Sequence, residues 1–235
     1  MKVNEIFTSI EGEGKRAGLP CTFIRLFGCN LKCSYCDSRY ACEGTDYTVM
    51  SVDNILDTCK MFGVPRVTVT GGEPLIHAGI NALLKALVDA GYEVNVETNG
   101  TMFPKIVPLE PVAYRPNPLK CEMEPVYDKK AGSVFYTMDW KCKSSGMEDK
   151  MHIDLVNELT KNDVLKFVVG SEEDMDGALT VIEQMTSKPQ VYFSPVFGKI
   201  EPTQIVDYLR NKKLYDCRVQ LQMHKYIWNP EQRGV

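Results

Sequence analysis

The strongest constraint on the fold of this 235-residue chain is a regular alternation of strand-like and helix-like segments. Runs rich in β-branched and aromatic residues predict strands at 21–28, 66–72, 92–100, 134–141, 164–170, 190–196 and 218–224. Amphipathic stretches with helical spacing lie between most of them, at 51–62, 78–91, 153–162, 173–186 and 201–214. This alternation predicts parallel strands with right-handed helical crossovers, and the number of repeats favours an α/β fold with a full or partial (β/α) barrel.

The segment at about 103–133 breaks this rhythm, because it is rich in proline and has no clear period. A structureless loop of this length is unusual inside a compact domain. We therefore expect a single domain over residues 1–235 that carries an irregular insertion at about 103–133.

Composition and charge exclude several classes of protein. The net charge is −4 and the basic residues are scattered, so no nucleic-acid partner is indicated. No apolar run reaches the length of a membrane span, and the N-terminus lacks the pattern of a signal peptide. These features predict a cytoplasmic protein with no membrane partner, in a compartment where thiols stay reduced.

Three of the nine cysteines are clustered, at Cys29, Cys33 and Cys36. The other six are dispersed, and we expect most of them to be small buried residues. Three thiolates on a short loop bind soft metals. Structural zinc needs four ligands, so a zinc site would require a distant fourth residue. A [4Fe–4S] cluster with three thiolates keeps one iron open for a ligand, and this is the interpretation we favour.

Further motifs follow the next two predicted strands. "GGEP" (71–74) follows the second and "ETNG" (97–100) follows the third. The carboxyl ends of parallel strands meet at one edge, which is where barrels of this type carry their chemistry. Arg25 lies in the middle of an apolar strand, and a buried guanidinium needs a carboxylate partner. That partner is either a substrate or an acidic residue of the protein.

The cysteine loop followed by "GGEP" resembles the radical S-adenosylmethionine superfamily. The resemblance implies a partial (β/α) barrel with outer helices, and a [4Fe–4S] cluster on Cys29, Cys33 and Cys36. It also implies that S-adenosylmethionine caps the open iron. The implied cofactor-binding residues are Tyr35, Cys36, Asp37, Gly71, Gly72, Glu73, Glu97, Lys141 and Ser144.

The leader (7–38) and the tail (218–235) resemble the 7-carboxy-7-deazaguanine synthase family. The resemblance implies a lyase of 7-deazapurine (queuosine) biosynthesis that contracts 6-carboxy-5,6,7,8-tetrahydropterin to 7-carboxy-7-deazaguanine and releases ammonia. It implies Mg²⁺ on Ser38, and no catalytic residue beyond the cofactor. The implied substrate-binding residues are Ile10, Glu11, Gly12, Glu13, Arg25, Thr70, Gln222, His224 and Val235. Glu11 departs from the glutamine that is usual in the family, and Lys143 stands where the family segment at 139–146 usually has proline.

The same resemblance implies a homodimer that receives electrons from a flavodoxin-like donor. Two other functions stay open from the residues alone. One is a glycyl-radical-activating enzyme, which shares the cysteine loop but acts on a protein. The other is a zinc-stabilised binding module without catalysis.

Overall fold

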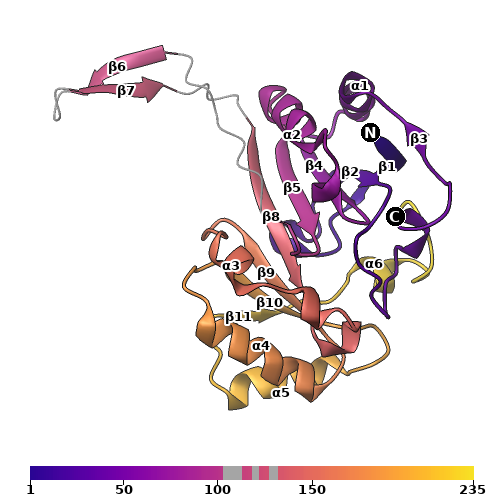
Figure 1. Ribbon diagram of the computed structural model, residues 1–235, viewed down its shortest axis with the longest axis vertical. Helices are drawn as coiled ribbons and strands as arrows, with labels where there is room; N and C mark the ends of the chain where they lie inside the picture. Colours follow the sequence, from indigo (N-terminus) through magenta and orange to yellow (C-terminus); the bar gives the residue numbers. More distant parts are fainter. Residues whose placement is uncertain (103–112, 118–121, 127–131) are drawn as a thin grey trace.

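A nine-stranded sheet forms the centre of the molecule (Figure 1). The structure, a computed structural model, describes residues 1–102, 113–117, 122–126 and 132–235. The strand order is β11-β10-β9-β8-β5-β4-β2-β1-β3. The bounds are β1 (Lys2–Ile10), β2 (Pro20–Leu26), β3 (Thr48–Val49), β4 (Arg66–Gly71), β5 (Glu93–Thr98), β8 (Ser133–Trp140), β9 (Val164–Val169), β10 (Gln190–Pro195) and β11 (Cys217–Val219). Neighbours from β2 to β11 are parallel, whereas β1 is antiparallel to β2 and β3.

Helices with hydrophobic side chains in the core pack against one face of this sheet, whereas the short helix α6 near the chain end contributes no side chain to that core (Figure 1). Their bounds are α1 (Val52–Phe62), α2 (Ile80–Asp89), α3 (Ile153–Asn157), α4 (Glu172–Gln184), α5 (Pro202–Asn211) and α6 (His224–Ile227). Helix α1 begins where the Ser51 hydroxyl accepts a hydrogen bond from the Asn54 amide at 3.1 Å, and it ends at Gly63, whose φ is +67°. The open, mainly parallel sheet with helices confirms the predicted α/β partial barrel.

Side chains along each parallel strand alternate between a hydrophobic face and a polar face. In β4, Val67 and Val69 pack into the core under the helices, and the intervening Thr68 points to the other face. In β9, Phe167 belongs to the same core while Lys166 lies on the inner face, where it pairs with acidic residues. The sheet therefore has a hydrophobic outer face, which the helices cover, and a polar inner face.

All the predicted parallel strands form, but the two ends of the chain differ from the prediction. Residues 2–10 form β1, although the sequence analysis assigned no strand there, because β1 runs antiparallel and lies outside the strand–helix rhythm. The last predicted strand, 218–224, was placed too far along the chain. β11 ends at Val219, and His224 begins helix α6 instead of ending a strand.

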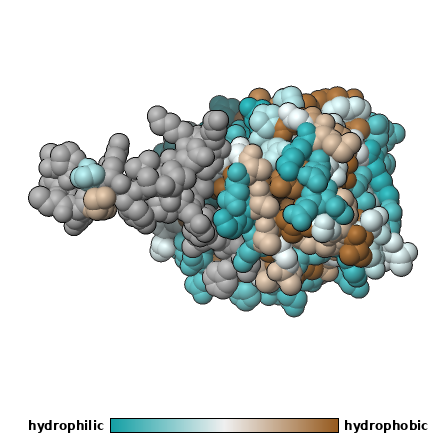
Figure 2. All heavy atoms as spheres, turned by 90° about the horizontal axis from the view of Figure 1, so that it is seen from above, coloured by the Kyte–Doolittle hydropathy of each residue, from teal (hydrophilic) through white to brown (hydrophobic). Residues whose placement is uncertain are grey.

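Much of the insertion predicted at 103–133 lies outside the described residues. Within it, β6 (Ala113–Asn117) and β7 (Glu122–Val126) form an antiparallel pair that is separate from the main sheet and projects from it in Figure 1. Among the described residues, no helix combines the length and hydrophobicity needed to cross a bilayer. On the face seen in Figure 2, hydrophobic and hydrophilic residues are interspersed.

The packing of α2 on the sheet makes a testable prediction for Leu84, which is fully buried in the core. Leu84→Ala should lower the free energy of unfolding by about 2–5 kcal/mol, because the truncation leaves a cavity. The matched control is Leu19→Ala at an exposed leucine, which should change it by about 0.5 kcal/mol or less. Urea unfolding of both variants makes the comparison, and equal small effects would contradict the assigned core.

Candidate active site

One cavity gathers residues from the leader, from the carboxyl ends of the parallel strands and from the tail. It is lined by every predicted site residue except Glu11, Glu73 and Ser144. Those that line it are Ile10, Gly12, Glu13, Arg25, Cys29, Cys33, Tyr35, Cys36, Asp37, Ser38, Thr70, Gly71, Gly72, Glu97, Lys141, Gln222, His224 and Val235. Residues from the whole length of the sequence thus meet in one place.

The cysteine loop follows β2 and faces this cavity. It is held by the Ser34 amide, which donates to the Ser145 carbonyl at 2.9 Å. The nearby Cys42 thiol is the main influence that lowers the pKa of Cys29 to about 6 and that of Cys36 to about 7. Burial raises the pKa of Cys33. Two of the three thiols are therefore readily available as thiolates, the form that binds metals.

The arrangement of these thiols favours a cluster over a single ion. A mononuclear zinc site needs its ligands to converge on one point at about 2.0–2.3 Å. Within the part of the chain that the structure describes, no three cysteine, histidine or acidic side chains converge in that way. In a [4Fe–4S] cluster each thiolate binds a different iron, so the thiols stay spread around a shared space. Four cysteines, Cys29, Cys33, Cys36 and Cys42, line this cavity, and a cluster held by the first three would keep one iron open for another ligand.

The Gly71–Gly72 turn at the end of β4 lies directly against the start of the cysteine loop. The Gly72 amide donates to the Leu26 carbonyl at 3.1 Å. A Cβ at position 72 would lie 2.1 Å from the Gly28 carbonyl oxygen and 2.8 Å from the Cβ of Cys29. Only glycine permits this approach, so the turn can place main chain beside a ligand of the cluster.

Glu73 was predicted to bind the cofactor, but its carboxylate points into the protein. It is fully buried and accepts hydrogen bonds from the Leu75 amide (2.9 Å), the Thr98 hydroxyl (2.9 Å) and the Asn99 amide (2.6 Å). Burial raises its pKa to about 7. These contacts tie the "GGEP" turn to the "ETNG" turn, so the side chain positions two walls of the cavity without lining it.

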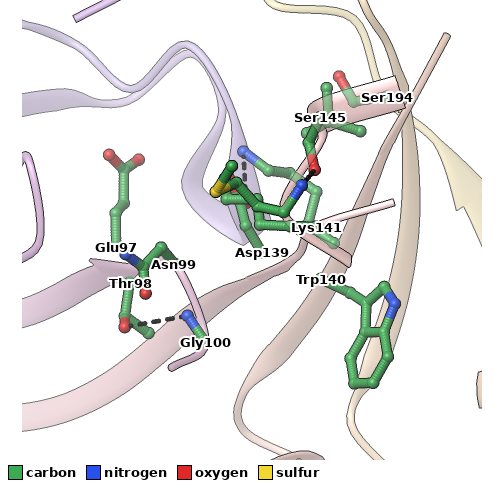
Figure 3. A network of polar contacts seen from close by, with 12 residues as sticks. Glu97, Thr98, Asn99, Gly100, Asp139, Trp140, Lys141, Ser145 and Ser194 are labelled. Atoms are coloured by element: carbon green, nitrogen blue, oxygen red, sulfur yellow. Dashed lines mark hydrogen bonds and ion pairs between the residues drawn. The ribbon is translucent and has the colours of Figure 1, made fainter. Parts of the chain in front are cut away.

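A buried chain of charges crosses the inner face of the sheet. Lys166 on β9, 6% exposed, contacts Glu13 at 2.6 Å and Asp139 at 3.1 Å. Asp139 also pairs with Lys141 at 2.7 Å, and Figure 3 shows these two at the end of β8. Sequence reasoning missed Lys166 and Asp139. The available signal was a lysine inside the apolar run "VLKFVV", the same pattern that drew attention to Arg25.

Glu97 points from β5 into the same cavity, beside β8 (Figure 3). The Thr70 hydroxyl donates to its Oε2 at 2.7 Å. Burial, together with the nearby Glu11 and Glu13 charges, raises the pKa of Glu97 to about 7 against the opposing charge of Lys166. A carboxyl group that changes protonation near neutral pH thus faces the cavity.

Arg25 has the carboxylate partner that its buried position demanded, and this partner is Glu5 of β1. The guanidinium Nε lies 2.7 Å from Glu5 Oε1, which also accepts from the Tyr40 hydroxyl at 3.0 Å. Nη1 lies 3.5 Å from the Ser38 hydroxyl. Glu5 occupies Nε of the Arg25 guanidinium. The edge formed by Nη1 and Nη2 is therefore the part that can bind a ligand carboxylate.

Ser38 and Asp37 present oxygen atoms next to this arginine. The Ser38 hydroxyl donates to Asp37 Oδ1 at 3.0 Å and makes no capping hydrogen bond to the following short helix. Asp37 also pairs with Lys225 at 3.0 Å. Burial opposes the ionised form of Asp37, but the Lys225 charge prevails and lowers its pKa to about 2. Asp37 is therefore ionised at neutral pH.

The leader and the tail hold each other in place. The Gln220 side chain makes two hydrogen bonds with the Gly14 backbone, at 2.6 and 2.9 Å, and the Met223 amide donates to the Gly12 carbonyl at 3.0 Å. A Cβ on Gly12 would lie 2.3 Å from Nδ1 of His224, so the imidazole packs directly on this glycine. Burial lowers the pKa of His224, which favours the neutral ring at the cavity wall.

Glu11 and Ser144 support the site from behind. The Glu11 carboxylate, 1% exposed, pairs with Arg16 at 2.7 Å and accepts from the Thr68 hydroxyl. Its side chain therefore anchors the leader loop and is turned away from the cavity. The Ser144 carbonyl accepts from the Ser34 hydroxyl at 2.6 Å, which fastens the cysteine loop to the segment after β8.

The chain end closes another side of the cavity. Residues 230–235, including Val235, line it. The Arg233 guanidinium lies 3.6 Å from the centre of the Tyr40 ring and pairs with Asp46 at 3.1 Å. These contacts explain why the C-terminus lies near β3 in Figure 1.

Comparisons with known proteins agree on one group. The model of the radical SAM superfamily matches residues 23–109. The 7-carboxy-7-deazaguanine synthase of Clostridium acetobutylicum is 43% identical over 238 residues, covering 100% of this chain and 99% of that protein. The synthase of Chlorobaculum tepidum is 38% identical over 240 residues, with 100% and 97% covered. The crystal structure of QueE from Escherichia coli matches with a TM-score of 0.71 at 22% identity, covering 95% and 94% of the two chains.

The buried Glu97 makes a prediction about pH. Its pKa is about 7 in the folded protein, compared with 4.5 for an unperturbed glutamate such as one in the unfolded chain. Between these values the folded protein holds a proton that the unfolded chain releases. Its contribution to stability is complete below about pH 4.5 and is lost as the pH rises through about 7. The glutamine of Glu97→Gln stays neutral at every pH. Between about pH 5 and 8 the free energy of unfolding should therefore fall by on the order of 2 kcal/mol less in this variant than in the wild type.

Urea unfolding at the two pH values measures this difference. The matched control is Glu93→Gln, at a half-exposed glutamate on the same strand, which should keep the wild-type pH dependence. A pH dependence that is identical in the wild type and Glu97→Gln would contradict the protonation assigned to Glu97.

Proposed function

This chain belongs to the 7-carboxy-7-deazaguanine synthase family of the radical SAM superfamily, and from that premise we propose the reaction that it catalyses. The substrate is 6-carboxy-5,6,7,8-tetrahydropterin. Its ring contracts by a radical rearrangement to 7-carboxy-7-deazaguanine with loss of ammonia. The product feeds 7-deazapurine (queuosine) biosynthesis.

The observation that carries the proposal is the convergence of Arg25, Glu13 and His224 with the three cysteines on one cavity. The Nη1–Nη2 edge of Arg25 suits a planar carboxylate, as the substrate has. Glu13 and His224 offer a hydrogen-bond acceptor and a neutral imidazole to the edge of a pterin. Because Gly12 has no side chain, the His224 ring packs against it and keeps its place in the cavity wall. We assign Ile10, Thr70, Gln222 and Val235 to the remaining walls of the substrate site.

Cys29, Cys33 and Cys36 would hold the [4Fe–4S] cluster, and the Gly71–Gly72 main chain would lie beside the amino acid part of S-adenosylmethionine. When bound, these two cofactors together supply a 5′-deoxyadenosyl radical. The chain's own residues bind and orient the substrate and the cofactors, and they exclude water from the cavity. Tyr35, Asp37, Glu97 and Lys141 line the cofactor side, with Glu73 and Ser144 fixing the turns behind it.

We place Mg²⁺ at Ser38, where the hydroxyl and the ionised Asp37 carboxylate provide hard oxygen atoms 3.0 Å apart. Magnesium keeps several waters and binds to few protein groups, so two protein oxygens with substrate oxygens suit it. The lyase would work in the cytoplasm as a homodimer with a flavodoxin-like electron donor. These last three assignments rest on the family alone, as does the single domain over 1–235.

Two alternatives have less support. A glycyl-radical-activating enzyme acts on a protein and would need an open groove, whereas residues 230–235 line this cavity. The relatives that match the whole chain are also named as synthases of a small molecule. A zinc-stabilised module would need a converging ligand set, which the described residues lack.

A turnover assay tests the proposal. The holoenzyme is incubated anaerobically with the tetrahydropterin, S-adenosylmethionine, Mg²⁺ and a reductant, and 7-carboxy-7-deazaguanine is measured by mass spectrometry. Cys33→Ala should lose both iron and product, because two thiolates hold a cluster poorly. Cleavage of the cofactor without any deazaguanine product would reject the proposed substrate.

Arg25→Lys should weaken substrate binding more than cofactor cleavage. Lysine keeps the charge but cannot form two parallel hydrogen bonds to a carboxylate. The loss of one charge-assisted hydrogen bond, about 1.5–3 kcal/mol, corresponds to roughly a ten- to hundredfold rise in KM. Turnover against substrate concentration, with uncoupled cofactor cleavage measured in parallel, separates the two effects. Equal damage to both steps would count against the assigned role.

A further inference from the structure

Lys166 lies in the wall of the cavity, but none of the binding roles proposed above includes it. It belongs to the fully buried run of β9, between Leu165 and Phe167 of the hydrophobic core. A buried ion pair adds little net stability compared with apolar residues of similar size. Stability alone therefore does not account for a lysine at this place, and its partners indicate another role.

Strand pairing fixes where the ammonium group of Lys166 lies. Lys166 on β9 is the register partner of Asp139 on β8, and its Nζ lies 3.1 Å from Asp139 Oδ1. Asp139 has a second cationic partner, Lys141, at 2.7 Å. The Lys166 ammonium also donates a hydrogen bond to Glu13 Oε2 at 2.6 Å. The lysine thus joins the sheet to a leader residue that we assign to the substrate.

The Glu13 side chain depends on this lysine for its direction. The neighbouring residues Gly12 and Gly14 are hydrogen-bonded to the tail, which fixes the backbone but not the side chain. Within the described part of the chain, the Glu13 carboxylate has two hydrogen-bond donors. Lys166 contacts Oε2 at 2.6 Å, and the Ser194 hydroxyl contacts Oε1 at 3.4 Å. Lys166 is therefore the closer of the two contacts that set the orientation of the carboxylate.

The Glu13 carboxylate keeps acceptor capacity for a ligand in the cavity that it lines. Two carboxylate oxygens offer about four lone-pair sites, and the donors from the protein use one on each oxygen. One further site on each oxygen suits a ligand with two parallel donors. A pterin presents such a pair, its 2-amino group and the neighbouring ring N–H. The match requires that the carboxylate hold one orientation.

We propose that Lys166 is a positioning residue for the substrate, which holds the Glu13 carboxylate in the orientation that accepts the 2-amino group and the ring N–H of the pterin. The carboxylate is then ordered on folding, so substrate binding does not have to order it. Burial opposes the charge of Lys166, but Asp139 and Glu13 prevail and raise its pKa well above the ordinary value. The inference rests on the proposed function, because it needs a pterin as the ligand.

Isothermal titration calorimetry of the anaerobic holoenzyme with 6-carboxy-5,6,7,8-tetrahydropterin tests the role. S-adenosylmethionine is present and the reductant is omitted, so no turnover occurs. Lys166→Met replaces the ammonium by an uncharged side chain of similar length and should weaken pterin binding roughly ten- to hundredfold, because a charged hydrogen-bond partner loses its orientation. Turnover should show the same rise in KM, while uncoupled cofactor cleavage stays near the wild-type rate because the Asp139–Lys141 pair remains.

The matched control is Lys60→Met, which removes an exposed ion pair with Asp57 on α1, outside the cavity. An exposed pair of this kind contributes little, so the variant should bind the pterin as the wild type does.

A double variant keeps the test valid if the unpaired Glu13 charge prevents Lys166→Met from folding. Lys166→Met/Glu13→Gln removes one positive and one negative charge and leaves Asp139 paired with Lys141. Because Lys166 acts through Glu13, the double variant should bind the pterin as tightly as Glu13→Gln alone. Weaker binding than in Glu13→Gln would overturn the role, since Lys166 would then act on the ligand by itself.

The remaining outcomes separate this role from the proposed function. Wild-type affinity in Lys166→Met, or an equal loss of pterin binding and cofactor cleavage, would overturn the role of Lys166, and normal turnover by the wild type would leave the synthase proposal intact. A wild-type holoenzyme that binds S-adenosylmethionine but neither binds nor converts the pterin would overturn both proposals.

Discussion

The site depends on the alternation of side chains along the parallel strands. Every second residue faces the helices and is apolar, which stabilises the sheet by removing hydrophobic surface from water. The residues between them cannot reach that core. They project onto the inner face, where β4, β5, β8 and β9 contribute Thr70, Glu97, Asp139 and Lys166. Because the strands are parallel and in register, these side chains and the loops after the strands meet at one edge.

The inner face of the sheet carries charged side chains. The ion pairs between them explain how the walls of the cavity are held together. An isolated buried lysine would be costly, so Lys166 is held between Glu13 and Asp139, and Asp139 in turn holds Lys141. This chain of contacts joins the leader to β8 and β9. A comparable set ties Arg25 to Glu5 and to the Ser38 loop. These ion pairs therefore hold the charged side chains of the strands in place and fix the loop that carries the three cysteines.

The sequence predicted what is periodic or chemically unusual. The parallel strands, the cysteine loop and Arg25 were found because β-branched runs, thiol spacing and a charge in an apolar strand are local signals. The antiparallel β1 and helix α6 were missed, since their places follow from long-range contacts such as Gln220 with Gly14. The inward turns of Glu11 and Glu73 depend on Arg16 and on the Asn99 amide, partners that no spacing reveals.

The central claim is that Cys29, Cys33 and Cys36 hold a four-iron cluster with one iron left for an exchangeable ligand. Mössbauer spectra of ⁵⁷Fe-enriched anaerobic protein, recorded before and after S-adenosylmethionine is added, test it most directly. The account predicts a cubane spectrum in which one of the four iron sites changes on addition. A spectrum without a cubane, or one whose four irons all stay unaffected, would contradict it.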